Sequence, residues 1–310
     1  MMEWPRGTFA FTVFDDTDFS TVENTKPIYD FLYECGFRTT KSCWVRQPDP
    51  GEQGKCPGST LAEDEYRQWI LDLRDRGFEI GLHNASFASS TRQQTKEALE
   101  TFTRIVGYPP RSFANHAGTR DSVYWGPARL SGVSRLVYNI LTRFRNKKLF
   151  VGHKKGTPFY WGDLLKEYVT YVRNFTYTEI NTIDVCPEMP YENPETPEAN
   201  MWFASCDGHD LSTFCKALSE ERQDQLESEG GCCIMYTYFG KGFVHGGAID
   251  PEFMRLMKRL ASKDGYFVPV GTLLDFIFEQ RGGGNSISRR RRCALSRKWI
   301  WQKILMGGTS

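Results

Sequence analysis

Short apolar runs alternate with segments of helical periodicity from residue 8 to residue 280. The apolar runs are rich in β-branched and aromatic residues, which is typical of buried strands. The predicted strands cover residues 8–14, 38–44, 78–82, 112–114, 168–172, 201–204, 232–236 and 266–270. Because strands and helices alternate without a clear linker, the pattern predicts a parallel sheet, most simply a seven- or eight-stranded α/β barrel.

The segments between these strands mostly predict helices. Helical periodicity and capping signals place helices at residues 27–35, 66–76, 90–106, 211–229, 251–262 and 272–280, and two more, broken near Gly132, within residues 120–148. Residues 45–60 and 184–200 are rich in turn-forming residues and charge, so they predict long loops. The second loop is a candidate for a lid over a site.

Polar residues cluster directly after the predicted strands. They are Asp15 and Asp16, His83, Asn115 and His116, Arg173 and Asn174, Asp207 and His209, and Tyr238. In a barrel of parallel strands these ends meet at one rim, so we expect the side chains to converge there.

The acidic end of the first strand is the strongest chemical signal at this rim. Asp15 and Asp16 are adjacent, and Asp18 follows two residues later. Neighbouring carboxylates repel, so a cation or a proton normally compensates them. A divalent metal is one answer, and a solvated turn, in which Asp is common, is the other.

The composition is that of a globular protein, with 25% charged residues and a net charge of +1. The charge is unevenly distributed, because residues 281–310 hold eight basic and no acidic residues. Because the net charge is close to zero, the chain as a whole does not suggest a polyanion-binding protein, and no nucleic-acid partner is expected.

The start of the chain shows no apolar signal-peptide core, and no apolar run reaches the length of a membrane span. The nine cysteines are odd in number and irregularly spaced, and none form a C-x-x-C pair. Together these features predict reduced thiols and a cytoplasmic protein.

The basic tail contains four consecutive arginines at 289–292, followed by an aromatic and aliphatic stretch from Trp299 to Leu305. We expect residues 281–310 to be partly helical. Three interpretations stay open: packing against the acidic barrel, peripheral contact with an anionic inner membrane surface, or binding of another partner.

Three segments resemble motifs of the polysaccharide deacetylases, the family whose domain is named after a nodulation-factor chitooligosaccharide deacetylase (carbohydrate esterase family 4). Residues 11–17 (FTVFDDT) resemble the first motif, residues 81–84 (GLHN) the start of the second, and residues 231–239 (GCCIMYTYF) the last. Their order and spacing agree with the family over about residues 8–280. The resemblance implies one distorted (β/α) barrel of about seven strands over residues 1–280, with residues 281–310 as a tail.

The resemblance also implies a divalent metal, zinc first and iron or cobalt as alternatives, and removal of an N-acetyl or other N-acyl group from a sugar or glycan precursor. Carried over by position, Asp15 is the general base, and Asp16 and His83 are metal ligands. A metal suits amide hydrolysis because it lowers the pKa of a bound water and polarises the carbonyl.

The chain departs from the family pattern at two positions. Phe87 stands where the family has a second histidine, and Tyr238 stands where it has the histidine that acts as general acid. His116 is our candidate for the missing ligand. Tyr238 or His209 is the candidate acid, with Tyr236 as a further option.

Four residues are candidates for substrate binding. Arg173 and Asn115 follow strands at the rim, and Arg173 also has the charge to orient Asp15. Trp161 and Trp202 are candidates for stacking on sugar rings, although aromatic residues are more often part of a core. The departures leave an alternative function open, a non-catalytic glycan- or partner-binding protein of the same fold, and a barrel hydrolase for another amide or ester is the third.

Overall fold

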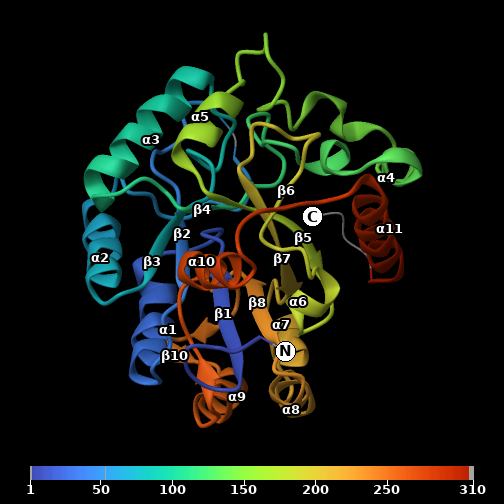
Figure 1. Ribbon diagram of the computed structural model, residues 1–310. Helices are drawn as coiled ribbons and strands as arrows, with labels where there is room; N and C mark the ends of the chain where they lie inside the picture. The colour runs from blue at the N-terminus through green and yellow to red at the C-terminus, as the bar shows by residue number, and fades with distance from the viewer. Residues whose placement is uncertain (1, 53, 307–310) are drawn as a thin grey trace.

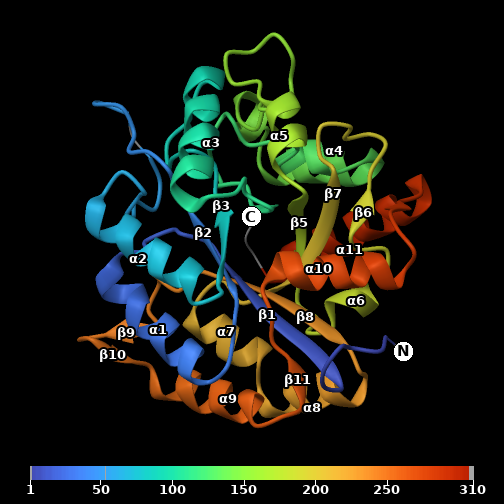
Figure 2. The same cartoon turned by 60° about the vertical axis from the view of Figure 1, so that its left-hand side comes forward.

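The computed structural model describes residues 2–52 and 54–306. Seven parallel strands close into a barrel in the order β1-β2-β3-β4-β5-β7-β8, and β8 pairs with β1 to complete the ring. Helices surround this barrel (Figures 1 and 2). The predicted α/β barrel is therefore confirmed, with seven strands in its ring.

The ring strands are β1 (Phe9–Asp15), β2 (Thr40–Cys43), β3 (Glu79–Leu82), β4 (Ser112–Phe113), β5 (Tyr171–Tyr177), β7 (Met201–Asp207) and β8 (Cys232–Thr237). The shorter strands are β6 (Tyr191–Glu192), β9 (Val244–His245), β10 (Ala248–Ile249), β11 (Gly265–Tyr266) and β12 (Asn285–Ser286). β1 is paired with β8 from Ala10↔Cys232 to Asp15↔Thr237, so both strands end at the same level of the rim.

The α-helices are α1 (Val22–Glu34), α2 (Asp64–Asp75), α3 (Arg92–Val106), α4 (Gly132–Leu141), α5 (Gly162–Tyr168), α6 (Thr182–Val185), α7 (Leu211–Ala217), α8 (Glu220–Ser228), α9 (Pro251–Ala261), α10 (Val270–Gln280) and α11 (Arg289–Met306). Two 3-10 helices, Gly126–Arg129 and Arg145–Lys148, flank α4.

β1 forms at the centre of the molecule because every residue from Phe9 to Asp15 is buried, as expected of a strand covered on both faces. Its apolar side chains join one continuous core with those of β8 and the surrounding helices. This packing leaves the carboxylates at the end of β1 buried near the rim of the barrel.

Several predicted elements differ from those observed. β5 runs to Tyr177, so Arg173 and Asn174 lie within the strand and not at its end. The predicted helix 211–229 is divided into α7 and α8. The predicted strand 266–270 is shorter than expected, because β11 covers only Gly265–Tyr266. Residues 120–148 hold one α-helix between two 3-10 helices. In the expected loop 184–200, β6 pairs with β7 and β12.

α11, within the tail, lies beside α4 on the outside of the barrel (Figure 1). Leu295 and Trp299 are buried, and Tyr138 of α4 stacks near Trp299 with ring centroids 6.1 Å apart. No helix among the described residues is long and apolar enough to cross a membrane.

Candidate active site

Three side chains that can bind a metal meet at the rim: Asp18, His83 and His116. His83 Nε2 lies 2.9 Å from an Asp18 oxygen, and His116 Nδ1 lies 3.3 Å from the other oxygen. The two histidine nitrogens are also 3.3 Å apart. All three side chains are almost completely buried, with residue exposures of 1–3%.

This spacing fits a tetrahedral metal site. With zinc–nitrogen distances of about 2.0–2.1 Å, the edge of a coordination tetrahedron is roughly 3.3 Å. Asp18 Oδ2 also has no hydrogen-bond partner among the described residues, although it lies 2.9 Å from His83 Nε2. A buried carboxylate oxygen without a donor is costly, and a cation held between the three side chains would satisfy it.

Each ligand comes from the segment that directly follows a strand. His83 follows β3, and its backbone N–H donates to the Cys43 carbonyl of β2. His116 follows β4, and its backbone N–H donates to Asn84 Oδ1 at 2.7 Å. Asn84 in turn donates to the buried Asp121 at 2.7 Å, so one amide ties the two histidine segments together.

Asn84 adopts a backbone conformation that favours this arrangement. Its φ is +56°, in the left-handed region that Asn tolerates better than most residues. Burial raises the pKa of Asp121, while Asn84 and the Ser90 N–H act to lower it. The result is a hydrogen-bonded support for the backbone of the two histidine segments.

Asp18 is ionised despite its burial. Burial acts to raise the pKa of Asp18, but the adjacent His116 and His83 outweigh it and lower the pKa below its usual range. A deprotonated carboxylate is the form that binds a metal.

Asp16 lies beside this group but is engaged with Arg173. Both Asp16 oxygens accept from the guanidinium, at 2.8 and 2.5 Å, and both side chains are buried. Burial acts to lower the pKa of Arg173, but Asp16 outweighs burial and raises it. Asp16 Oδ1 is 3.8 Å from His83 Nδ1, so the carboxylate is adjacent to the ligand group. The group that could hold a metal thus contains Asp18, while the predicted ligand Asp16 lies next to it.

Asp15 points away from the ligand group. One oxygen accepts from the Phe239 N–H at 2.9 Å, and the other from Tyr29 and Lys41, both at 3.0 Å. Burial raises the pKa of Asp15, although these three partners act to lower it. All of these contacts are internal, which favours a structural role for Asp15. Arg173 pairs with Asp16 and not with Asp15.

The alternation of side chains along a strand explains these directions. Phe14 contacts Phe203 and Arg173 of the facing strands, so it points into the barrel, and Asp16 lies on the same side two residues later. Asp15 is on the opposite side and meets Tyr29 of α1. This two-residue period is the signal that separates Asp16 from Asp15, whereas Asp18 lies in the turn that follows β1.

The candidate proton donors lie in different surroundings. Tyr238 is half-buried, and burial and the nearby Asp18 and Asp16 raise its pKa well above 10. Burial, Tyr238 and Asp16 also raise the pKa of Tyr236, whose ring lies 4.2 Å from the Arg173 guanidinium. A hydrogen bond to Asp207, 2.9 Å away, raises the pKa of His209. His209 is the group that more readily carries an exchangeable proton at neutral pH.

The other predicted substrate-binding residues are internal. Asn115 exchanges two hydrogen bonds with the backbone of Val123, at 3.1 and 2.6 Å. Trp161 is 0% and Trp202 is 1% exposed, which leaves no ring face for a sugar. Trp161 donates to the Asp121 carbonyl, and Trp202 donates to Thr196. Both are core residues in this structure, and stacking with a sugar is not proposed for them.

Sequence reasoning missed residues that surround the histidines. Trp44 is fully buried, with its ring centroid 6.0 Å from His83, 5.3 Å from His116 and 5.1 Å from Phe87. Phe87 therefore belongs to the aromatic wall of the site. Trp44 directly follows β2, a position that the search for polar strand ends passed over.

A loop segment at residues 54–59 lies across this group. Its Lys55 N–H donates to the Phe87 carbonyl, and its Ser59 N–H to the Ser20 carbonyl. Cys56 accepts from the Phe19 N–H, and burial and the Asp18 carboxylate raise the pKa of its thiol. This cover accounts for the low exposure of the three candidate ligands.

Solved structures of polysaccharide deacetylases are similar to this chain in fold. A protein named as a polysaccharide deacetylase from Mycobacterium smegmatis aligns over 93% of this chain and 96% of its own, with a TM-score of 0.50 and 11% identity. The peptidoglycan deacetylase PdaC from Bacillus subtilis aligns over 90% and 94%, with a TM-score of 0.40 and 14% identity. A family 4 acetyl xylan esterase from Clostridium thermocellum, in complex with cobalt, aligns over 88% and 92%, with a TM-score of 0.39 and 12% identity.

A scan of protein-family models and a search of curated proteins gave no match. The likeness is therefore one of structure at low sequence identity. The chain has the fold of the polysaccharide deacetylases in a divergent form, as its three motifs predicted.

Proposed function

We propose that this protein is a metal-dependent hydrolase that removes an N-acetyl or other N-acyl group from a sugar or glycan precursor. The convergence of Asp18, His83 and His116 at the barrel rim, with all their ligand atoms within 4.8 Å of one another, carries the proposal. The motif resemblance and the names of the structural neighbours support a carbohydrate as the substrate.

One carboxylate and two imidazoles form a donor set suited to zinc, with iron or cobalt as alternatives. A divalent metal bound there would supply a water of lowered pKa and polarise the substrate carbonyl. The three side chains leave room in a four-coordinate set for a non-protein ligand, as catalytic zinc sites do. The proposal therefore replaces the predicted ligand Asp16 with Asp18.

Asp16 is the proposed proton acceptor. Arg173 donates to both of its oxygens and fixes the plane of the carboxylate. Asp16 is close enough to the three proposed ligands to accept a proton from the attacking water, since Asp16 Oδ1 is 3.8 Å from His83 Nδ1. Asp15, which we predicted as the base, is proposed instead to fix the end of β1 through Lys41.

His209 is proposed to donate the proton to the leaving amine. Its hydrogen bond to Asp207 raises its pKa, so the imidazolium is populated at neutral pH. Tyr238 stays protonated because its pKa is well above 10, and it is a poorer donor for that reason. Tyr238 is assigned a hydrogen-bonding role at the rim.

The alternative is a glycan-binding protein of the same fold without turnover. It is favoured by one observation, that Phe87 and Tyr238 occupy the positions where the family has histidines. Under this alternative the site still binds a metal, but N-acetylated sugars are not hydrolysed.

The test uses the whole chain and a matched pair of variants. Asp18→Asn removes the charge of the proposed ligand, and Asp250→Asn makes the same change at the N-cap of α9. Metal content is measured by elemental analysis, and acetate release is measured from N-acetylated chitooligosaccharides. We expect the native protein and Asp250→Asn to bind metal and release acetate, and Asp18→Asn to lose the metal and at least about 100-fold of the activity.

Each outcome separates the hypotheses. Metal binding that depends on Asp18, without acetate release, contradicts hydrolysis of these sugars and favours the binding protein. No bound metal, together with an Asp18→Asn variant that behaves as the native chain, overturns the metal site itself.

A further inference from the structure

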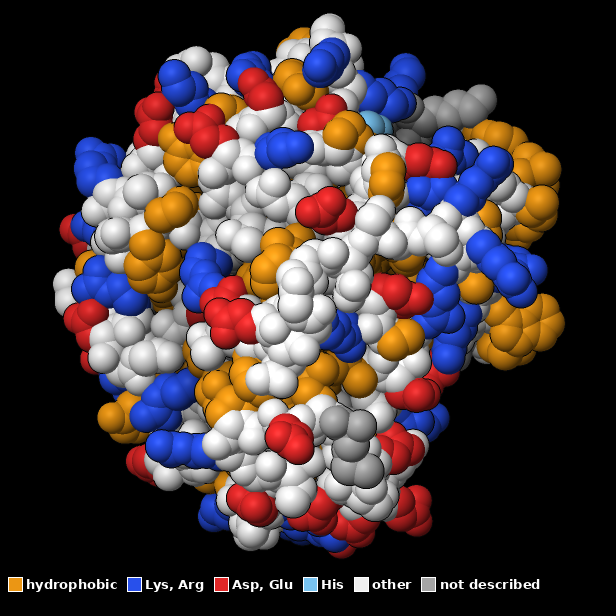
Figure 3. All heavy atoms as spheres, viewed as in Figure 1, with side chains coloured by type: hydrophobic (Ala, Val, Ile, Leu, Met, Phe, Trp, Pro, Cys, Tyr) orange, Lys and Arg blue, Asp and Glu red, His pale blue; other side chains and the backbone are white. Residues whose placement is uncertain are grey.

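Two neighbouring helices expose an unusual number of large apolar side chains. We define the α4–α11 face by seven of them, which are 47–75% exposed: Val133, Leu136, Ile140, Leu141, Trp301, Ile304 and Leu305. Figure 3 shows hydrophobic side chains gathered at this edge of the molecule, with Lys and Arg between them. Apolar patches of this kind mark interaction sites on monomeric proteins.

The exposed apolar residues of α4 lie on one side of the helix. Val133, Leu136 and Ile140 follow the spacing i, i+3, i+7, which places them on one stripe. Ser134 and Tyr138 on the other side are buried. A helix normally buries its apolar stripe against the core. The exposed apolar stripe of α4 is therefore typical of a surface that another molecule covers.

α11 is held firmly against α4 and the barrel. The Arg129 guanidinium lies 4.0 Å from the rings of both Trp125 and Trp299, and Tyr177 donates to the Leu295 carbonyl. Because these contacts fix the buried side of α11, the exposure of Trp301, on the opposite side, is a property of the packed helix.

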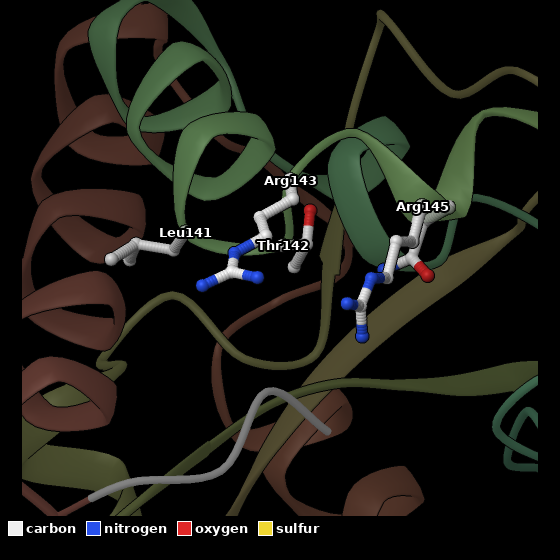
Figure 4. A pocket seen from close by; sticks show the side chains of 5 residues that line it. Leu141, Thr142, Arg143 and Arg145 are labelled. Atoms are coloured by element: carbon white, nitrogen blue, oxygen red, sulfur yellow. The ribbon is translucent and has the colours of Figure 1, made fainter.

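The surroundings of this face are basic. Residues 122–162 and 280–310 together hold 16 of the 39 Lys and Arg residues and no Asp or Glu. Four of these basic residues, all on α11, pair with acids of other segments: Arg291, Arg292, Lys298 and Lys303. At the end of α4, Leu141, Thr142, Arg143, Arg145 and Asn146 line a hollow of about 360 Å³. Figure 4 shows the Arg143 and Arg145 side chains extending to the same side of the loop. This arrangement suits an anionic group beside an apolar surface.

We propose that the α4–α11 face docks on the surface of an anionic lipid bilayer. The aliphatic side chains and Trp301 enter the boundary between headgroups and acyl chains, and Arg143 and Arg145 contact lipid phosphates. Nucleic acid has the matching charge, but it offers no apolar layer to cover seven exposed hydrophobic side chains. A second copy of the chain has an apolar surface, but it brings an equally basic face.

The test is co-sedimentation of the full chain with vesicles of phosphatidylcholine alone or mixed with phosphatidylglycerol. We expect binding to the mixed vesicles only, weakened by at least about tenfold in Arg143→Glu/Arg145→Glu. Trp301→Ser/Leu305→Ser is expected to weaken binding to a similar degree, because it removes the inserted apolar area. Lys96→Glu/Arg104→Glu on α3 makes the same charge change away from the face and is expected to bind as the native chain does.

Circular dichroism is the control for folding. If the variants have the native spectrum, a loss of vesicle binding is due to the changed surface. The proposal is overturned if the native chain stays in the supernatant with mixed vesicles, or if the α3 variant loses as much binding as the α4 variant. It is also overturned if light scattering shows that the native chain self-associates, that Trp301→Ser/Leu305→Ser abolishes this self-association, and that the native chain does not bind the vesicles. None of these outcomes depends on the hydrolase activity proposed above.

Discussion

Charges are compensated in opposite ways at the end of β1 and on the α4–α11 face. At the end of β1, the buried Asp15 and Asp16 each have a buried cationic partner, Lys41 and Arg173. On the α4–α11 face, acids of other segments pair with four basic residues of α11, whereas Arg143 and Arg145, beside the exposed end of α4, have no ion pair within the described part of the chain. Buried charge must be balanced within the chain, whereas exposed charge is free to be balanced by a partner.

Removing the buried cation that pairs with Asp15 is expected to give the largest change in stability. Lys41→Met leaves the Asp15 carboxylate buried without its cation, and we expect a loss of about 3–5 kcal/mol in the free energy of unfolding. Lys26→Met is the matched control, because Lys26 pairs with Asp30 on the exposed side of α1. We expect less than about 1 kcal/mol for that change. Urea unfolding measures both, and equal losses would contradict a structural role for the Lys41 pair.

The two tryptophans of α11 sharpen the comparison on one helix. Trp299 is 0% exposed and Trp301 is 63% exposed. Trp299→Ala is expected to cost about 3 kcal/mol of unfolding free energy, and Trp301→Ala to stay within about 0.5 kcal/mol. Only Trp301→Ala is expected to weaken vesicle binding in the folded protein. A large loss of stability from Trp301→Ala would show that this ring is packed and not exposed.

The smallest of the expected changes in stability comes from His153, a partly buried imidazole. Its ring stacks on Tyr124, and its Nδ1 accepts from the Tyr124 N–H at 3.2 Å. Burial, with Lys154 nearby, lowers the pKa of His153 to about 4. The unfolded chain therefore takes up this proton first, and stability is lost as the pH falls from about 6.5 to about 4.

We expect this loss to reach on the order of 2 kcal/mol at pH 4, and His153→Gln to remove most of it. Thermal unfolding of both proteins across this pH range measures the difference. Parallel pH profiles for the native chain and His153→Gln would contradict the assignment.

The barrel was predictable because the signal that specifies it is local. Apolar runs such as residues 8–14 and 232–236 are unambiguous strands, and their alternation with helices leaves few topologies. The limits of β5 were less predictable because Arg173 and Asn174 are polar. Their strand continues through them because both side chains find partners in the folded chain, Asp16 for Arg173 and the Tyr191 hydroxyl of β6 for Asn174. Such partners are distant in the sequence, so the local pattern of apolar and polar residues does not predict them.

The candidate site was predictable in its location and partly in its members. His83 and His116 meet as expected, because both follow adjacent strands of a closed ring. The choice among Asp15, Asp16 and Asp18 depended on which side of β1 each one faces, and a family motif does not state that direction. Trp44 was missed because an apolar ring beside two imidazoles has no polar signature in the sequence.

The amide that joins the two histidine segments also affects how this protein should be produced. Asn84 begins the tripeptide Asn84-Ala85-Ser86, which is an acceptor for N-linked glycans in a eukaryotic secretory pathway. In the folded chain its side chain is 1% exposed, and both ends are engaged by His116 and Asp121. A glycan attached during translocation would occupy the space where the two segments join, so a secretory host would yield misfolded chains that a cytoplasmic host avoids.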